Sequence, residues 1–158
     1  ESAIRIISKV GELNNPADRD HCLQYMVAIG LLKGNLVAED YEDDVAKDPR
    51  VDELREKMII NEDKRYSKEY LEADKRSIAN RIKVHFKDGT ATNEVEVEYP
   101  IGHKRRRKEG IPILEKKFKD NLSITYDESK SNEIFELCMN QRKLEETSVA
   151  DFQQLLSK

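Results

Sequence analysis

Cysteine and histidine are scarce in this chain, which has two of the first and three of the second in 158 residues. Two cysteines cannot form a disulfide framework. The sequence has no His-x-x-His or Cys-x-x-Cys spacing, the kind of spacing with which proteins present zinc ligands. The acidic run 39–44 lacks the glycine and the ligand spacing of a calcium-binding loop. We therefore expect no metal site.

Long apolar runs and an excess of basic residues are absent as well. No apolar run approaches the roughly 18 residues that a membrane-spanning helix needs. Lys and Arg total 28 against 32 Asp and Glu, which gives a net charge of −4, whereas a dedicated nucleic-acid-binding domain usually carries a basic excess. We expect neither a membrane nor a nucleic acid as a partner. The length suits one domain with a buried core.

The first residues predict a strand. Alternation in Ile4-Arg5-Ile6-Ile7 favours extended structure over residues 3–9. The chain opens on Glu1 and not on methionine. Because a natural N-terminus rarely begins inside an element of secondary structure, we expect this chain to be the C-terminal piece of a longer protein.

A helix is predicted from Pro16 to Gly34. Asn15 is a suitable N-cap residue, and proline is tolerated at the first helical position. Glycine is a common helix terminator. An apolar stripe at helical spacing is expected to face the core, and it comprises Leu23, Met26, Val27, Gly30 and Leu31. A second stripe, expected to meet another surface at close range, comprises Ala17, His21, Gln24 and Ala28, with Tyr25 beside them.

Shorter elements are predicted after this helix. We expect an acidic helix over 38–46, a helix over 49–57 capped by Asp48, a strand or buried extended segment over 58–60, and a polar loop with a helical turn over 61–77. Near the C-terminus we expect a helix from Pro112 to about 122, a helix over 128–146, and a last short helix capped by Ser148.

A β-hairpin is the best sheet signal in the chain. Apolar and charged residues alternate over 78–86 and 95–99, on either side of the strong turn dipeptide Asp88-Gly89. The pattern predicts one apolar face and one charged face with cross-strand charge pairs. Together, these elements predict an α+β fold with a small, mostly antiparallel sheet and packed helices.

Residues 14–25 concentrate polar side chains at the start of the first predicted helix. His21 beside Asp20 could serve as a general acid or base. The free N–H groups of the helix start could also receive a carboxylate, although nearby aspartates compete for them. The alternative is a histidine that only hydrogen-bonds locally.

A second cluster, residues 102–107, follows the hairpin. Gly102 allows a close approach of the backbone to a ligand, and the arginines can bind carboxylates through paired hydrogen bonds. Three interpretations stay open here: a solvated loop, an anion site, or a nucleic-acid patch. No aromatic residue interleaves with these cations, so base stacking has little support.

Both clusters together resemble the MmgE/PrpD family. The resemblance extends in order and spacing from about residue 4 to 125, and more weakly to the end. The residues that carry it are 14–29 (Asn-Asn-Pro-Ala-Asp-Arg-Asp-His-Cys-Leu-Gln-Tyr-Met-Val-Ala-Ile), 40–43 (Asp-Tyr-Glu-Asp), 78–80 (Ile-Ala-Asn), 88–90 (Asp-Gly-Thr), 97–103 (Val-Glu-Tyr-Pro-Ile-Gly-His) and Arg105-Arg106.

The resemblance implies a two-domain enzyme with its active site between the domains. Residues 1–125 would form the α+β lid domain, and 126–158 would be C-terminal helices that pack on an absent N-terminal helical domain. A tricarboxylate substrate, a homodimer at full length and no cofactor are implied too. His21 would be catalytic, and the substrate contacts would be Asn15, Arg19, Asp20, Gln24, Tyr25, Gly102, His103, Arg105 and Arg106.

Within this family the dehydratase branch is favoured. A relative that decarboxylates cis-aconitate has a tyrosine in the segment that matches residues 58–63, and this chain has none there. A sibling decarboxylase or isomerase, and a non-catalytic domain that binds partners through the basic loop, are the alternatives. The resemblance implies a mitochondrial location in a eukaryote, which the composition favours, and a cytoplasmic one in a bacterium. We expect the chain alone to be inactive.

Overall fold

The computed structural model describes residues 2–157, with side chains from residue 4 onward. The chain forms two compact units, Glu1–Ser77 and Ile78–Lys158. The regular elements among the described residues are helices and one antiparallel pair of strands, so the predicted α+β class is confirmed. The predicted domain boundary at 125/126 falls between two helices of the second unit and stays a prediction.

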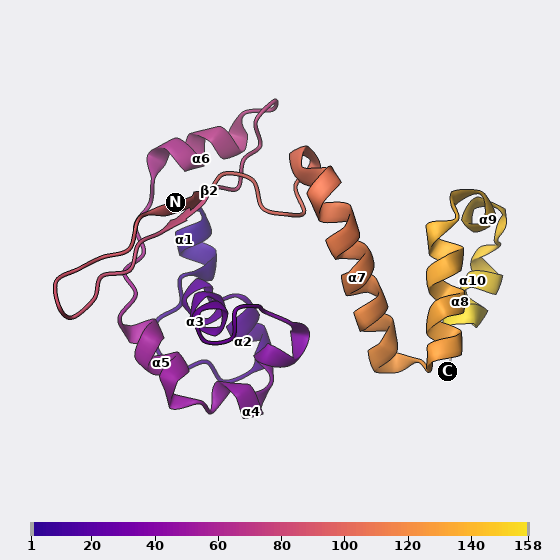
Figure 1. Ribbon diagram of the computed structural model, residues 1–158, viewed down its shortest axis with the longest axis horizontal. Coiled ribbons are helices and arrows are strands. Elements are labelled where there is room, and N and C mark those ends of the chain that lie inside the picture. Colours follow the sequence, from indigo (N-terminus) through magenta and orange to yellow (C-terminus); the bar gives the residue numbers. More distant parts are fainter. Residues whose placement is uncertain (1, 158) are drawn as a thin grey trace. The chain divides into compact units, whose positions relative to one another are not determined.

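The elements described in the first unit are all helices, and Figure 1 shows α2, α4 and α5 grouped around α3. Its elements are α1 (Ser2–Ile7), α2 (Pro16–Asp20), α3 (Leu23–Lys33), η1 (Ala38–Tyr41), α4 (Asp43–Ala46), α5 (Pro49–Glu56) and α6 (Lys64–Leu71).

Two predictions of extended structure in this unit need correction. The predicted strand over 3–9 is wrong, because Ser2–Ile7 is helical. Ile4 and Ile7, one turn apart, are half-buried while Ile6 is 55% exposed, which is the burial period of a helix. Residues 58–60 form no strand, and Ile59 is 86% exposed. The region 61–77, predicted as mostly loop, contains the eight-residue helix α6.

The predicted helix 16–34 is divided in two at Cys22. Its predicted ends are confirmed: the Asn15 side chain accepts a hydrogen bond from the Asp18 N–H (2.9 Å), and Gly34 ends α3 with a φ of +81°. Cys22 has an extended backbone, which resets the helical phase between α2 and α3. The predicted apolar stripe lies wholly within α3 and is wrong, because the opposite face, with Tyr25 and Ile29, is buried while Leu31 is 52% exposed.

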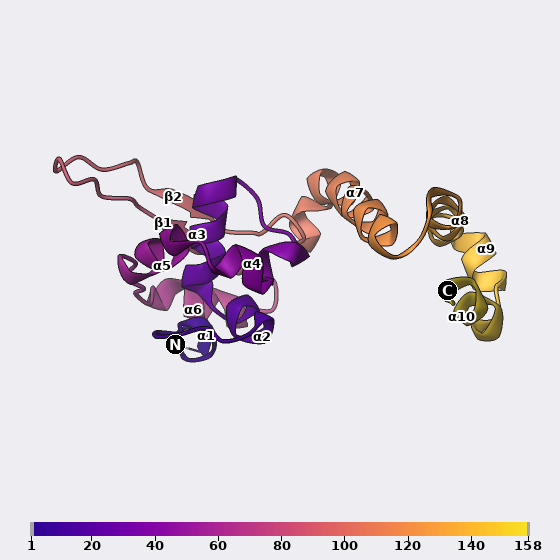
Figure 2. The same ribbon diagram turned by 90° about the horizontal axis from the view of Figure 1, so that it is seen from below.

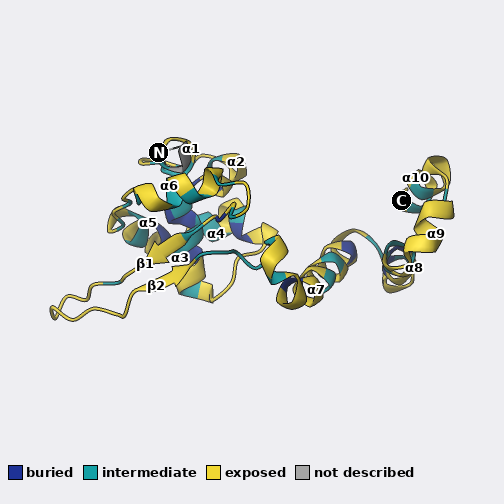
Figure 3. Ribbon diagram, turned by 90° about the horizontal axis from the view of Figure 1, so that it is seen from above, coloured by how far each residue is buried: buried dark blue, intermediate teal, exposed yellow. Residues whose placement is uncertain are grey.

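The core of the first unit forms where α3 packs on α5. Its fully buried members are Cys22, Tyr25, Ala28, Ile29 and Val51. Figure 3 shows this buried patch in the middle of the unit. The face that carries Gln24, Ala28 and Tyr25, predicted to meet another surface, thus points into the core.

Replacing Gly34 by alanine is expected to lower the free energy of unfolding by roughly 1 kcal/mol, because a Cβ is strained at positive φ. Gly30 offers a matched control in the same helix, since it has open space around its Cα. Gly30→Ala should raise stability by up to about 1 kcal/mol through helix propensity. Urea unfolding midpoints measure both, and equal shifts of the same sign would contradict the assignment of Gly34 as a left-handed cap.

The hairpin of the second unit is confirmed. Strands β1 (Asn80–Ile82) and β2 (Val95–Val97) pair antiparallel, with Ile82 opposite Val95. Beyond these strands, His85 forms a bridge with Ala91. Between this bridge and the Ile82–Val95 pair, the returning side of the hairpin has one residue more than the outgoing side. Gly89 turns the chain with a φ of +87°. Figure 2 shows the loop projecting beyond the paired strands.

The helices that follow differ from the prediction in two places. A short turn η2 (Lys104–Arg106) leads into α7 (Arg107–Thr125), so Pro112 lies inside the helix and does not begin it. The predicted helix 128–146 is broken at Asn140, whose side chain caps a new helix; the two parts are α8 (Glu128–Met139) and α9 (Gln141–Glu146). The last helix, α10 (Val149–Leu156), begins at Ser148 as predicted.

Candidate functional site

The start of α2 is held by a compact set of polar contacts. Asn15 donates from its side-chain amide to the Asp18 carboxylate (3.0 Å), and Lys9 forms an ion pair with the same carboxylate (3.0 Å). The hydrogen bond from Lys9, with that from the Asn14 N–H, holds the pKa of Asp18 below its ordinary value. The predicted substrate residue Asn15 is thus a helix cap, and its side chain remains exposed.

Arg19, also predicted to contact substrate, is buried. Only 4% of the residue is exposed. Its guanidinium donates to the carbonyl oxygen of Tyr41 (2.6 Å) and to the Asp43 carboxylate (2.7 Å). Arg19 therefore ties α2 to the end of η1 and to the start of α4.

Gln24 and Tyr25 point into the same interior. Gln24 donates to the Ser8 hydroxyl (3.2 Å). Tyr25 donates to the carbonyl oxygen of Asp40 (2.6 Å), and burial raises the pKa of its hydroxyl. These predicted substrate residues therefore have internal hydrogen-bond partners, and each would reach a ligand only if those bonds changed.

Asp20 and His21 are exposed members of the first cluster. They follow one another at the end of α2, where His21 is the C-cap residue. The Nδ1 atom of His21 contacts the Asp20 carboxylate, and the two side chains are 58% and 46% exposed for His21 and Asp20. A carboxylate at one ring nitrogen orients the imidazole and leaves the other nitrogen for chemistry. This pair has the arrangement of a histidine base with its orienting acid.

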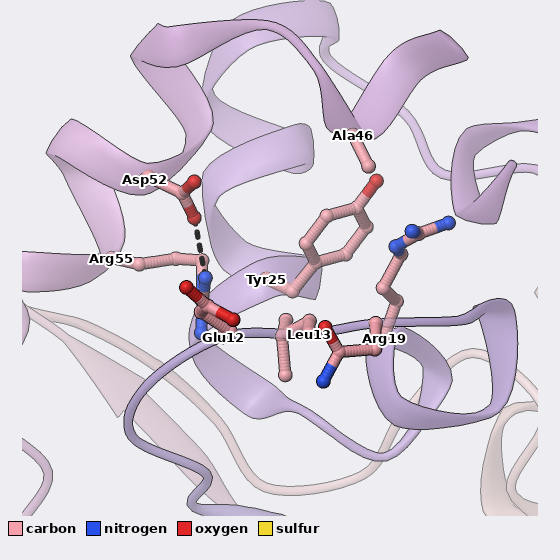
Figure 4. Close-up of a pocket in the computed structure, with 8 residues that line it drawn as sticks. Glu12, Leu13, Arg19, Tyr25, Ala46, Asp52 and Arg55 are labelled. Carbon is pink, nitrogen blue, oxygen red and sulfur yellow. Dashed lines mark hydrogen bonds and ion pairs between the residues drawn. The ribbon is translucent and has the colours of Figure 1, made fainter. Parts of the chain in front are cut away.

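The first unit also contains a cavity of about 230 Å³, which neither Asp20 nor His21 lines. Figure 4 shows the Tyr25 ring between Arg19 and the Asp52–Arg55 ion pair. The Nε atoms of Arg19 and Arg55 are buried and have no hydrogen-bond partner among the described residues. The residues that line this cavity are Glu12, Leu13, Asn14, Arg19, Tyr25, Ala46, Asp52 and Arg55. Sequence reasoning gave no sign of this cavity, because Arg55 and Asp52 occur in an ordinary charged helix.

Two aspartates that hold the first unit together predict its acid sensitivity. Burial raises the pKa of Asp40, but hydrogen bonds from Lys33 and from the Val37 N–H (2.8 Å) outweigh it, and the net pKa is lowered. Asp48 caps α5, and its hydrogen bonds from Arg50 lower its pKa to about 2.

Lowered pKa values mean that these carboxylates stabilise the fold above the unfolded pKa, and that this stabilisation is lost as the pH falls through the folded values. We expect the melting temperature to fall between about pH 4 and about pH 2. Asp48→Asn, which keeps a capping side chain, should flatten the slope in this window. Thermal melts across the window measure it, and an unchanged slope in the variant would contradict the role of Asp48.

The basic cluster forms a tight turn in the second unit. The His103 N–H donates to the carbonyl oxygen of Pro100 (2.9 Å), and the Nδ1 atom of His103 accepts from the N–H of Arg105 (3.2 Å). Arg106 donates to the carbonyl oxygen of Tyr99 (3.0 Å) and pairs with Glu109 (2.8 Å). The hydrogen bond from Arg106 lowers the pKa of Glu109.

Tyr99 is a residue that sequence reasoning missed. No aromatic residue interleaves with the cations in the sequence, but the turn brings the Tyr99 ring back onto them. Its centroid lies 4.6 Å from that of the His103 ring, and the Arg105 guanidinium carbon lies 5.1 Å from the Tyr99 centroid. Cation–π and ring contacts of this kind hold side chains in place. The structure therefore brings His103, Arg105 and Arg106 together around Tyr99, with Gly102 exposed in the same turn.

Gly110 fixes this turn to α7 and was also missed. It is buried, and a Cβ at this position would overlap the carbonyl oxygen of Ile101, a backbone atom. Gly110→Ala is expected to cost about 1–3 kcal/mol of stability as an overpacked site and to displace residues 102–106. Urea unfolding measures the loss, with the open helical glycine of Gly30→Ala as control. An unchanged midpoint would show that the turn does not depend on this contact.

The predicted site residues fall into two groups, one in each unit. Asp20 and His21 are exposed in the first unit, where Arg19, Gln24 and Tyr25 are buried. Within residues 2–157, no three His, Cys, Asp or Glu side chains are grouped so that they could hold a metal ion. In the same range, every helix is too short or too polar to cross a membrane.

These features define a helical and α+β domain with a histidine–aspartate pair and a basic turn. Residues 1–141 match the model of the MmgE/PrpD C-terminal domain, and the chain belongs to that family. The resemblance predicted from the two clusters is thereby confirmed.

The chain is also similar to curated 2-methylcitrate dehydratases. It is 53% identical to the one from Escherichia coli K12 over 152 residues, which cover 96% of this chain and 32% of that protein. It is 55% identical to a mitochondrial 2-methylcitrate dehydratase from Yarrowia lipolytica over 85% of this chain and 26% of the relative. A probable 2-methylcitrate dehydratase from Saccharomyces cerevisiae is 52% identical over 82% of this chain and 25% of the relative. The matched part of the chain thus spans between a quarter and a third of the length of these relatives.

Proposed function

We propose that this chain is the C-terminal part of a 2-methylcitrate dehydratase, which removes water from 2-methylcitrate to give 2-methyl-cis-aconitate in propionate breakdown. The observation that carries the proposal is the identity of 53% to the Escherichia coli enzyme across 96% of the chain. The Asp20–His21 pair and the basic turn supply groups that this chemistry needs.

Dehydration of a hydroxy acid breaks a C–H bond next to a carboxylate and a C–O bond on the neighbouring carbon. It needs a base for the proton and positive charge or hydrogen-bond donors for the carboxylates. His21 is the candidate base. Residues of the basic turn, Gly102, His103, Arg105 and Arg106, are the candidate carboxylate contacts. Asn15 and Asp20 of the first unit are candidate substrate contacts as well.

Arg19, Gln24 and Tyr25 have a different part in this proposal. Their polar atoms are hydrogen-bonded inside the first unit. They would hold α2 and α3 in place through hydrogen bonds to η1 and to Ser8, and would so position Asp20 and His21. Their expected contact with the substrate is therefore replaced, in our proposal, by a positioning role.

The remainder of the enzyme would lie in a preceding helical domain. Relatives are about three times as long as this chain. Helices α7 and α10 carry exposed apolar residues that would suit packing on such a domain; among them are Ile113 at 51% exposure, Ile124 at 63% and Val149 at 76%. We propose that the full-length protein is a homodimer, that it needs no cofactor, and that the chain alone has no activity. A mitochondrial location follows if the source is eukaryotic.

A substrate panel tests the reaction class. The full-length protein is incubated with 2-methylcitrate, citrate or cis-aconitate, and both absorbance of a conjugated double bond and CO₂ release are followed. Dehydration of 2-methylcitrate in preference to the others supports the proposal. Release of CO₂ from cis-aconitate would instead indicate the sibling decarboxylase, and inactivity on all three would favour a non-catalytic role.

A further inference from the structure

Two histidines, His21 of the first unit and His103 of the second, have opposite partners at the same ring nitrogen. At His21, Nδ1 contacts the carboxylate of Asp20, which when ionised can only accept a hydrogen bond. At His103, Nδ1 faces the backbone N–H of Arg105 at 3.2 Å, which can only donate. The first nitrogen must therefore carry a proton, and the second must be bare.

A neutral imidazole carries one proton, so the partner of Nδ1 decides what Nε2 presents. His21 with a proton on Nδ1 has a bare Nε2, which can take up a proton. His103 with a bare Nδ1 has its proton on Nε2, which can donate a hydrogen bond but cannot accept a proton there. The two histidines therefore differ at Nε2, which is a proton acceptor in His21 and a hydrogen-bond donor in His103.

Resting on the proposed dehydration, we propose that His21 is the proton acceptor of the reaction and that His103 is a hydrogen-bond donor to a substrate oxygen. The C–H bond next to a carboxylate breaks, and its proton moves to Nε2 of His21. The electron pair of that bond forms the C=C bond. The C–O bond breaks, its electron pair leaves with the hydroxyl, and the hydroxyl takes a proton from solvent to become water. His21 then returns its proton to solvent. The Nε2–H of His103 donates to a carboxylate oxygen equally in the bound substrate and in the transition state, so it contributes to substrate binding and not to the rate of the chemical step.

Each ring is held by groups of its own unit, so this division of roles depends on local contacts alone. The His21 ring is 58% exposed, which leaves its Nε2 side accessible to a substrate. The His103 ring packs on the Tyr99 ring at 4.6 Å, and its backbone N–H donates to Pro100. These contacts fix the ring of His103 with Nδ1 toward the backbone of the turn.

Nitrogen NMR of ¹⁵N-histidine-labelled full-length protein tests the placement of the protons. At about pH 8, where an unperturbed histidine is neutral, protonated and bare ring nitrogens give well-separated signals. Loss of signals in His21→Gln and His103→Gln assigns the two residues. We expect a protonated Nδ1 at His21 and a protonated Nε2 at His103. The same tautomer at both residues, or the reverse pair, would overturn the inference even if the protein is an active dehydratase.

Kinetics of matched replacements test the roles. The side-chain oxygen of asparagine can replace Nδ1 of His103 as a helix-cap acceptor, and the amide nitrogen of glutamine can replace its Nε2–H. We therefore expect His103→Asn to raise KM for 2-methylcitrate more than His103→Gln does. For His21→Gln, kcat should fall at least about 100-fold with little change in KM.

The third histidine, His85, is exposed on the hairpin, and His85→Gln should leave both constants unchanged. A fall in kcat at His103 as large as that at His21 would contradict the donor role. Correct tautomers in a protein that does not dehydrate 2-methylcitrate would remove the proposed function and keep the placement of the protons.

Discussion

Replacing Tyr25 by alanine is expected to destabilise the first unit by about 3–5 kcal/mol, the usual cost of deleting a large buried aromatic side chain. Tyr25 is 2% exposed and lies at the centre of the contact between α3 and α5. A loss of this size is comparable with the whole stability of many domains. We therefore expect little folded protein at ambient temperature, as judged by urea unfolding and circular dichroism.

Two further variants separate packing from other roles of this side chain. Tyr25→Phe keeps the ring and removes the hydrogen bond to Asp40, so it should cost about 1–2 kcal/mol. Tyr70, which is 51% exposed on α6, serves as the control, and Tyr70→Ala should change stability by less than about 0.5 kcal/mol. If Tyr25→Phe raised KM at unchanged stability, the hydroxyl would contact substrate and the positioning role would be wrong.

His21→Ala in the full-length protein is expected to lower kcat for 2-methylcitrate by roughly 10²–10⁴-fold, the usual contribution of a positioned general base. His21 is exposed and caps a short helix, so its removal should leave the melting temperature nearly unchanged. The side chain is not needed to bind the carboxylates, and KM should change little. Steady-state kinetics and a thermal melt on the same sample measure both quantities.

The matched control for this variant is His85→Ala. His85 is an exposed histidine of the hairpin, outside both clusters. The His85→Ala variant should retain its activity on 2-methylcitrate. A loss of activity in His21→Ala that is accompanied by unfolding, or an equal loss in His85→Ala, would remove His21 as the base.

Local signals predicted the ends of helices and the turn of the hairpin. Asn15, Gly34, Asp48 and Ser148 each occupy the cap position that the sequence indicated, because capping depends on a few neighbouring residues. The Asp88-Gly89 turn is equally local. The sequence therefore predicted these features well.

The buried faces of the first unit could not be predicted from periodicity. The extended backbone at Cys22 separates His21 of the predicted polar stripe from Gln24 and Ala28, whereas the predicted apolar stripe lies wholly within α3. The stripe that looked apolar faces outward at Leu31, and the polar stripe faces the core through Gln24 and Tyr25. Tertiary contacts overrode the pattern, since Gln24 and Tyr25 find hydrogen-bond partners at Ser8 and Asp40 that are remote in sequence.

In the candidate site, too, the sequence predicted some features and not others. The clusters around His21 and His103 were evident from residue types, and the family match agrees with them. What the sequence left open was which polar side chains face solvent. Arg19 is buried because the carbonyl oxygen of Tyr41 and the carboxylate of Asp43 accept its hydrogen bonds. Likewise, Tyr99 joins the basic turn only because residues 100–103 reverse the chain.

Dehydration of 2-methylcitrate by the full-length protein, followed by ultraviolet absorbance in the presence of a chelator, tests the central claim most directly. We predict a steady rise in absorbance as the conjugated double bond forms, unaffected by the chelator, and none with the 158-residue chain alone. Absence of any rise with the full-length protein, or turnover by the chain by itself, would contradict the account.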